Sequence, residues 1–385
     1  MRPSAKPGIL AGMIRLHEKL TGALYGGAIG DAMGAPVEGW SPQRIQQQFD
    51  THDLKTFLPP THGGDPATGK GDGRITDDTL LTEALIRAYR QAGTHLDAYG
   101  YEQFLLPEMA AKKVWVPERQ AEMAILERLW WPEKYPWIRL TMANADPRQA
   151  GVGNIVNCGV AMWMMPVGAM NAGDPAGAYA EATALGLAHN ESFAVEAAGV
   201  MAACFAAAFG ARATVADVLA VTGRDGTGQA LRATVAAAQK AKSLAGFIRA
   251  VRTAVAPFDQ RTGHVTDDRP LHAPAAASDL GKPSRLASIE ELPVAVAALV
   301  FGAGDFDKTL RAAVFYGRDC DSIAAMAGGL FGALHGVSAL PARLRAASDA
   351  ANRRDFGALA AGFAPVVRAV LAADQRRLAR RRAAV

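Results

Sequence analysis

The sequence predicts an all-α protein that folds as one compact, multi-helix domain. Alanine is abundant, whereas runs of β-branched or aromatic residues are few, and this balance favours helix over strand. Hydrophobic residues make up 50% and charged residues 20% of the 385 residues, enough to bury one sizeable core. No internal repeat or linker divides the chain. We therefore expect a single domain over 1–385, with its core at about 18–352 and a basic C-terminal helix at about 355–385.

The first predicted helix covers 18–34 and carries a glycine at every fourth position. These glycines share one stripe of the helix: Gly22, Gly26, Gly30 and Gly34. Since glycine weakens a helix, the stripe needs a compensating reason. That reason is either close packing against another helix or close approach of the backbone to a ligand. Asp31, in the same helix, is interpreted as structural.

Helical periodicity continues along most of the remaining chain. Residues 41–75 and 257–287 lack it and carry prolines or glycines, so we expect loops there. In 151–173, a Gly/Asn loop leads into a buried helix that Pro166 interrupts. Other helices are expected at 79–91, 175–188, 191–210, 213–222, 228–254, 288–302, 305–316, 322–336, 341–351 and 355–384.

The segment 101–150 is predicted to form helices joined by irregular turns. It holds four of the chain's six tryptophans, together with several prolines: Trp115, Trp130, Trp131 and Trp137. These rings either belong to the core or form a stacking platform over a cleft.

Charge, cysteine content and hydropathy indicate the compartment and the classes of partner that we expect for the protein. The net charge is +4, and much of the excess lies in five arginines between 376 and 382, which form either a solvated helix end or a phosphate-binding tail. We expect the former, and no nucleic-acid partner. Three widely spaced cysteines suit a reducing compartment, and residues 1–20 show no convincing cleavage site. The apolar stretch 192–211 contains Glu196, which favours a buried helix over a membrane span. We expect a cytoplasmic protein without a membrane partner.

Two acidic motifs stand out, each at the start of a predicted helix. The first is Thr76-Asp77-Asp78-Thr79, and the second is Gly317-Arg318-Asp319-Cys320-Asp321-Ser322. One aspartate at a helix start is an ordinary cap, worth about 1 kcal/mol. A second like charge in the same turn is repelled unless a cation lies between the two. Each motif alone is therefore either a cap with a solvated charge or half of a cation site.

The donor atoms of these motifs select the kind of cation. Carboxylate and hydroxyl oxygens are hard ligands that suit Mg²⁺, Mn²⁺ or Ca²⁺ better than zinc. Six such side chains exceed what one Mg²⁺ normally takes from a protein, so two neighbouring ions bridged by a carboxylate fit the number better. Asp319 and Asp321 would diverge on a helix, so they converge only if 317–321 is a loop.

Ordered segments along the chain resemble the ADP-ribosylglycohydrolase family, which includes the enzyme that removes ADP-ribose from dinitrogen reductase. The matching segments are GALYGGAIGDAMGAPVEGW at 22–40, GRITDDTLLTEAL at 73–85, NCGVAMWMMPVGA at 157–169, AHNESFAVEAA at 188–198, ELPVAVAAL at 291–299 and FYGRDCDSIAAMAGGLFGALHG at 315–336. The resemblance implies an all-α fold and a binuclear magnesium or manganese centre. It also implies six metal ligands: Thr76, Asp77, Asp78, Asp319, Asp321 and Ser322.

The resemblance further implies residues around the metal centre. Glu38 matches an acidic residue at the mouth of the site that takes part in acid–base chemistry. Asp146 is the candidate for a second, general-base carboxylate. Residues resembling those that line the ribose or diphosphate pocket are Asn157, Gly159 and His189. Arg318 stands where the family usually has glycine, and it either lies against a substrate phosphate or points to solvent.

The implied reaction is hydrolysis of the bond between ADP-ribose and an acceptor, either a modified protein side chain or a small ADP-ribosyl molecule. Carboxylates would stabilise the oxocarbenium character that builds up as the leaving group departs. Two alternatives remain open. One is hydrolysis of another ribosyl bond, such as that of a nucleoside, and the other is a non-catalytic binding or structural relative.

Overall fold

The computed structural model describes residues 15–49, 54–61, 70–223, 225–258 and 288–384. Within these ranges the predicted all-α class is confirmed, because one helical domain holds only a single two-stranded sheet. Most of the predicted loop 257–287 lies outside the described residues.

The described helices follow one another along the chain in this order. They are α1 (Leu16–Gly34), α2 (Pro42–Phe49), α3 (Asp77–Ala92), α4 (Ala98–Gly100), α5 (Leu106–Ala110), α6 (Ile125–Arg128), α7 (Trp131–Thr141), α8 (Met165–Met170), α9 (Pro175–Gly186), α10 (Ser192–Ala208), α11 (Val215–Leu219), α12 (Asp225–Lys240), α13 (Leu244–Val255), α14 (Ser288–Gly302), α15 (Phe306–Phe315), α16 (Cys320–His335), α17 (Ala342–Asn352) and α18 (Phe356–Ala383).

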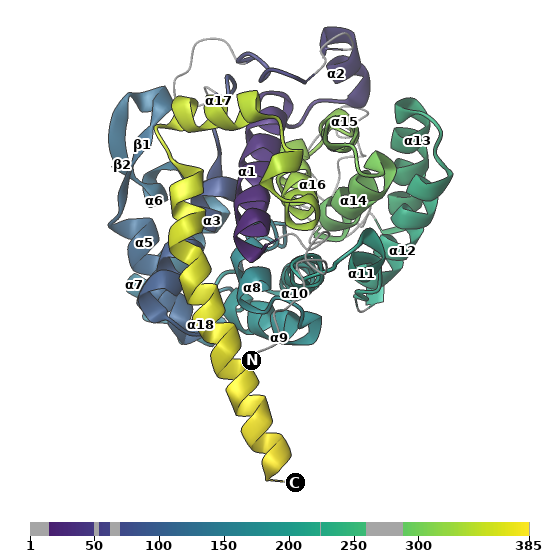
Figure 1. Ribbon diagram of the computed structural model, residues 1–385. Coiled ribbons are helices and arrows are strands. Elements are labelled where there is room, and N and C mark those ends of the chain that lie inside the picture. Colours follow the sequence, from purple (N-terminus) through teal and green to yellow (C-terminus); the bar gives the residue numbers. More distant parts are fainter. Residues whose placement is uncertain (1–14, 50–53, 62–69, 224, 259–287, 385) are drawn as a thin grey trace, which may run out of the picture.

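Helices α1 and α16 lie side by side in the middle of the molecule, although some 300 residues separate their starts (Figure 1). The glycine stripe of α1 makes this contact. A Cβ atom added at Gly26 would lie 2.1 Å from the carbonyl oxygen of Gly328, and one at Gly34 would lie 2.5 Å from the Cα atom of Asp321. The packing interpretation of the stripe is thus confirmed, and its last glycine places the start of α16 against the end of α1.

Two predicted irregular regions contain regular structure. Residues 42–49, expected as loop, form α2, which begins at Pro42 and buries Ile45 and Phe49. Proline suits the first turn of a helix, where its missing N–H costs nothing. Within 101–150, strands β1 (Lys113–Val116) and β2 (Ala121–Ala124) form an antiparallel hairpin in which Val116 pairs with Ala121. We had expected only helices and turns there.

Two predicted helices have different limits in the structure. The helix predicted at 228–254 is two helices, because α12 ends at Lys240 and Ser243 caps the start of α13 through a hydrogen bond from Gly246 N. Pro166 does not interrupt a helix; it stands in the first turn of α8. Serine at an N-cap and proline in the first turn are both ordinary helix-start signals.

The buried helix expected at 191–210 is confirmed as α10, whose residues from Ala197 to Ala208 are all buried. Helix α18 packs against α1 and α3 and then projects from the body of the protein (Figure 1). Among the described residues, α18 is the one helix long and apolar enough to cross a membrane by length and composition, and 33% of its apolar window is buried. A helix that packs on a protein core passes the same test, so this finding is weak evidence for a membrane span.

Candidate active site

The start of α3 is held against α1 by Asp31. This fully buried carboxylate accepts hydrogen bonds from the backbone N–H groups of Thr76 (2.9 Å) and Thr79 (3.2 Å). It also accepts from both threonine hydroxyls, at 2.8 Å and 2.5 Å. Four donors compensate for burying a charge here. Asp31 therefore has the structural role we expected, and it fixes the backbone from which Asp78 projects.

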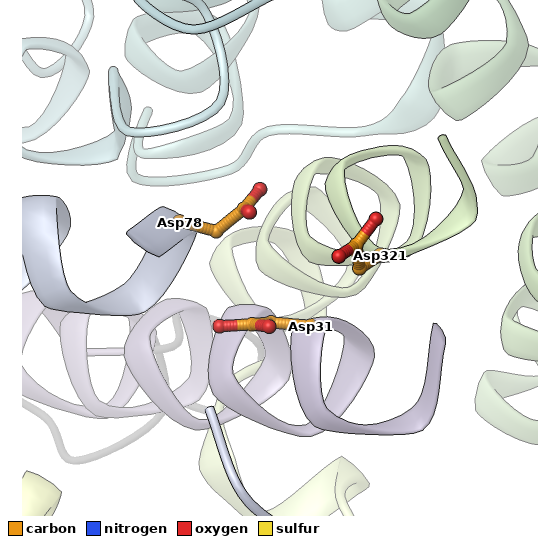
Figure 2. A group of neighbouring side chains, drawn as sticks. All are labelled: Asp31, Asp78 and Asp321. Carbon is orange, nitrogen blue, oxygen red and sulfur yellow. The ribbon is translucent and has the colours of Figure 1, made fainter. Parts of the chain in front are cut away.

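The two acidic motifs meet at this point. Oxygen atoms of Asp31, Asp78 and Asp321, all buried, lie within 4.8 Å of one another, and we call these residues the inner group. Glu38, Asp319 and Asp321 satisfy the same criterion and are called the outer group, since Glu38 and Asp319 are only partly buried. Figure 2 shows the inner group as three carboxylates contributed by three different helices, α1, α3 and α16. Asp321 belongs to both groups and can bridge two cations.

The convergence of Asp319 and Asp321 comes from a local turn rather than a long loop. Gly317 and Arg318 both have positive φ, of 74° and 58°, and α16 begins directly afterwards at Cys320. Asp319 is the N-cap residue, and Asp321 is the second residue of the helix. The sharp turn aims both carboxylates to the same side, which the spacing alone did not indicate.

The Arg318 side chain is buried in an ion pair rather than pointing to solvent. Its side chain is 8% exposed, and its Nε atom lies 3.0 Å from the carboxylate of Glu290, which is 4% exposed. A non-glycine residue with positive φ costs about 1–2 kcal/mol. The buried ion pair with Glu290 explains how an arginine is held in a conformation that glycine would adopt without strain.

The inner group has the chemistry of a site for hard cations. One oxygen of Asp78 (Oδ1) and one of Asp321 (Oδ1) are buried without a hydrogen-bond partner among the described residues. Burial raises the pKa of both carboxyls, and the neighbouring charges of Asp31 on Asp78 and of Asp319 on Asp321 raise them further. Buried carboxylates that repel one another need a cation to stay ionised together. Oxygen donors without partners are what Mg²⁺ or Mn²⁺ would bind.

The other predicted ligands lie around the same space. Thr76 caps α3, and its hydroxyl contacts both Asp31 (2.8 Å) and an Asp78 oxygen (3.1 Å). Burial raises the pKa of the Glu133 carboxyl, and the negative charge of Asp77 raises it further. Ser322 is buried, with its hydroxyl 3.6 Å from the sulfur of Met162.

A network of polar residues connects the predicted substrate residues to the acidic cluster. The Asn157 side chain accepts hydrogen bonds from Gly159 N and from the Asn190 amide, both at 3.1 Å. It lies 3.5 Å from Glu133, to which it donates. The thiol of Cys158, between Asn157 and Gly159, donates to Asp319 Oδ2 at 2.9 Å. The loop at 157–159 is therefore directly beside Asp319, one of the predicted metal ligands.

His189 is fully buried beneath this loop. Its Nδ1 lies 3.1 Å from the Tyr101 hydroxyl, and its ring packs edge-on against Tyr101 and Trp163. Burial lowers the pKa of His189 to about 3, so the ring is neutral. Its Nε2 has no hydrogen-bond partner in the described part of the chain. The ring is fully buried, so in this structure it contacts protein groups and not a surface open to a sugar.

Asp146 is not placed as a general base. It caps a short 3₁₀ helix at the surface and pairs with Arg148, at 2.7 Å, with 36% of its side chain exposed. Hydrogen bonds from Arg148 lower its pKa to about 2, so it is a weak base. The expected catalytic role for Asp146 is not supported by these contacts.

Glu133 is the carboxylate in 101–150 that the structure brings to the cluster, and we did not identify it from the sequence. It is 1% exposed on α7, and its Oε2 has no hydrogen-bond partner among the described residues. The available signal was a lone glutamate in the apolar, proline-containing string WWPEKYPW, where a solvated charge would not be expected.

Comparisons with known proteins show the family and the fold. The model of the ADP-ribosylglycohydrolase family matches residues 13–377. An Escherichia coli K12 protein titled "Uncharacterized protein YegU" is 26% identical over 351 residues, which cover 90% of this chain and 96% of that protein. The Rhodospirillum rubrum ADP-ribosyl-[dinitrogen reductase] glycohydrolase is 38% identical over 91 residues, 24% of this chain and 29% of that one. A solved "ADP-ribosylglycohydrolase-related protein complex" matches 91% of this chain and 99% of its own, with a TM-score of 0.53 and 21% identity, which supports the fold.

Proposed function

Because this chain belongs to the ADP-ribosylglycohydrolase family, we propose that it hydrolyses the glycosidic bond between ADP-ribose and an acceptor with the help of divalent cations. The observation that carries this proposal is the position of Asp321, which completes both the inner and the outer group of carboxylates. Asp78 and Asp321 come from acidic motifs some 240 residues apart, and two such carboxylates would not be expected to be buried within 4.8 Å of each other unless a cation site required it.

Two hard cations, Mg²⁺ or Mn²⁺, fit the donor set. The residues that would hold them are Thr76, Asp77, Asp78, Asp319, Asp321 and Ser322, with Glu38 at the outer group. Bound there, the cations would polarise the ribose hydroxyls and lower the pKa of a coordinated water.

Glu133 and Glu38 are the carboxyls that could exchange protons during the reaction. Burial, followed by the charge of Asp77, raises the pKa of Glu133, and the Asn157 amide donates to its other oxygen. A carboxyl with a raised pKa can accept a proton from water and return it to a leaving group near neutral pH. We propose Glu133 in the role first assigned to Asp146.

The substrate would lie between the acidic cluster and the loop at 157–159. Asn157 and Gly159 are held by their mutual hydrogen bond, and the neutral, buried ring of His189 packs against Trp163, whose indole N–H donates to the Gly159 carbonyl oxygen. Neutral donors there suit sugar hydroxyls, while carboxylates nearby stabilise positive charge at the anomeric carbon. The acceptor would be a modified protein side chain or a small ADP-ribosyl molecule.

A substrate panel with a ligand variant tests the proposal. The purified chain is incubated with Mg²⁺ or Mn²⁺ and with arginine- and serine-ADP-ribosylated protein, small ADP-ribosyl molecules and free nucleosides. Chromatography then measures released ADP-ribose and free base. We expect ADP-ribose release from at least one ADP-ribosyl substrate, and more than a 100-fold loss in Asp321→Ala. Glu102→Ala, which removes an exposed carboxyl, is the matched control.

Three outcomes would overturn the proposal. Full activity of Asp321→Ala, or of the wild type in excess chelator, would contradict the cation-dependent mechanism. Release of free base without release of ADP-ribose would indicate a nucleoside-type hydrolase. Binding of ADP-ribose without any turnover would indicate a non-catalytic relative.

A further inference from the structure

Lys70 places a positive charge inside the outer group. Its ammonium forms an ion pair with Glu38 and lies 3.4 Å from Asp321 Oδ2. Glu38 and Asp321, two of the three carboxylates of the outer group, therefore already contact the positive charge of Lys70. The lysine side chain is 31% exposed and the Asp321 side chain 4%, so the ammonium reaches from the mouth of the site towards its interior.

An ammonium and a divalent cation compete for the same oxygens. A lysine ammonium is a compact charge with three donors and no acceptor, so it binds carboxylates but cannot share them at close range with another cation. It is also tethered, which gives it a high effective concentration at the site. A divalent cation in the outer group must displace Lys70 from Glu38 and Asp321.

The inner group is less affected by Lys70. Lys70 contacts the inner group only at Asp321 Oδ2. The two oxygens without a hydrogen-bond partner, Asp78 Oδ1 and Asp321 Oδ1, are not contacted by the lysine. Asp31, the third member, is bound by Thr76 and Thr79 rather than by a cationic side chain. A cation can therefore approach the inner group without first breaking the ion pair between Lys70 and Glu38.

We propose that Lys70 is a built-in competitor for the outer cation, so that the inner position fills first and the outer position binds a divalent ion at least tenfold more weakly. This inference rests on the proposed cation dependence and adds a determinant of cation affinity to the same site. The outer position would then be occupied only when the free divalent cation is plentiful.

Titration with Mn²⁺ tests this order. The full-length chain is titrated by isothermal calorimetry, and free Mn²⁺ is followed by electron paramagnetic resonance, which also detects coupled Mn²⁺ pairs. For the wild type we expect two affinity classes that differ at least tenfold. In Lys70→Met, which keeps the length of the side chain but removes its charge, the weaker class should tighten at least tenfold and the stronger class change less than threefold.

Matched variants test whether the change in Mn²⁺ affinity comes from the charge of Lys70 at the outer group. Lys308→Met removes an exposed lysine that lies over the Phe301 ring, and it should bind Mn²⁺ like the wild type. Glu38→Gln should abolish the weaker class, which identifies it as the outer group. Lys70→Gln serves as a second neutral variant, and circular dichroism verifies that each variant is folded.

The possible failures are distinguishable. If Lys70→Met and Lys70→Gln leave the weaker class unchanged or weaken it further, Lys70 is not a competitor, and the inference is wrong while the proposed function stands. Two Mn²⁺ sites of equal affinity in the wild type would also show that Lys70 is not a competitor. If neither the wild type nor any variant binds Mn²⁺ or Mg²⁺, the cation-dependent function fails and this inference fails with it.

Discussion

Replacing Gly30 by alanine should separate α1 from α16 and disturb both stability and cation binding. A Cβ atom at Gly30 would lie 2.0 Å from the carbonyl oxygen of Ala324, where ordinary contact begins at 3.4 Å. The two helices would have to move apart by more than about 1 Å, because the obstacle is backbone that cannot rotate away. Overpacking of this kind costs about 1–3 kcal/mol or more.

Gly27 provides the matched control on the same helix. A Cβ atom there would lie 3.6 Å from the carbonyl oxygen of Ala325, which is ordinary contact. Gly27→Ala should therefore keep only the gain in helix propensity, about 0.5–1 kcal/mol. Because Gly30→Ala gains the same helix propensity, the unfolding free energy of Gly30→Ala should fall below that of Gly27→Ala by the overpacking cost, about 1–3 kcal/mol.

Urea unfolding followed by circular dichroism at 222 nm measures the difference, and Mn²⁺ titration measures its effect on the site. A displacement of α16 moves Asp321 relative to Asp31, so the Mn²⁺ affinity of Gly30→Ala should fall at least tenfold, whereas that of Gly27→Ala should not change. Equal unfolding free energies in the two variants would refute the account of how α1 and α16 pack. Unchanged Mn²⁺ affinity in a destabilised Gly30→Ala would refute the link from this packing to the site.

Two other predictions concern single side chains. Glu133→Gln should lower kcat at least about 100-fold without changing the number of Mn²⁺ ions bound, while Asp146→Asn should keep nearly full activity. Steady-state kinetics measure both variants. The reverse pattern would identify Asp146 as the base. His95 should stabilise the fold at low pH, because hydrogen bonds to Glu181 (2.5 Å) and Asp374 (2.8 Å) raise its pKa from 6.5 to about 9. That stabilisation, about 2 kcal/mol after allowing for partial exposure, is fully present below pH 6.5 and is lost as the pH rises through 9. The stability gap between wild type and His95→Gln, measured by urea unfolding, should therefore shrink between pH 6 and pH 10, and a constant gap would contradict the assignment.

The sequence predicted the all-α fold class and the position of the two acidic motifs at helix starts, because both depend on local signals. Helical periodicity and alanine content identified most helices, and paired aspartates at two helix starts indicated the cation chemistry. The glycine stripe of α1 predicted a closely packed partner helix, but it did not identify which helix that would be. Ser243 and Pro42 gave ordinary start signals that the apolar pattern obscured, so α13 and α2 were missed as separate helices.

What the sequence did not predict depends on contacts between distant segments. Glu133 carries no motif and acquires its place only because α7 packs beside the loop at 157–159. Lys70 is one lysine in a glycine-rich loop, and nothing near it in the sequence indicates a carboxylate partner. Arg318 was expected at a phosphate or in solvent because Glu290, its actual partner, lies on another helix.

The pairing of α1 with α16 also has a consequence for synthesis on the ribosome. The first helix of the described chain cannot bury its glycine stripe, and Asp31 cannot meet Asp321, until residues 320–335 have been made. Contacts of such long sequence separation close late and slow folding. A nascent chain stalled before residue 317 would retain many native helices, but it would lack Asp319 and Asp321 and could complete neither the inner nor the outer group.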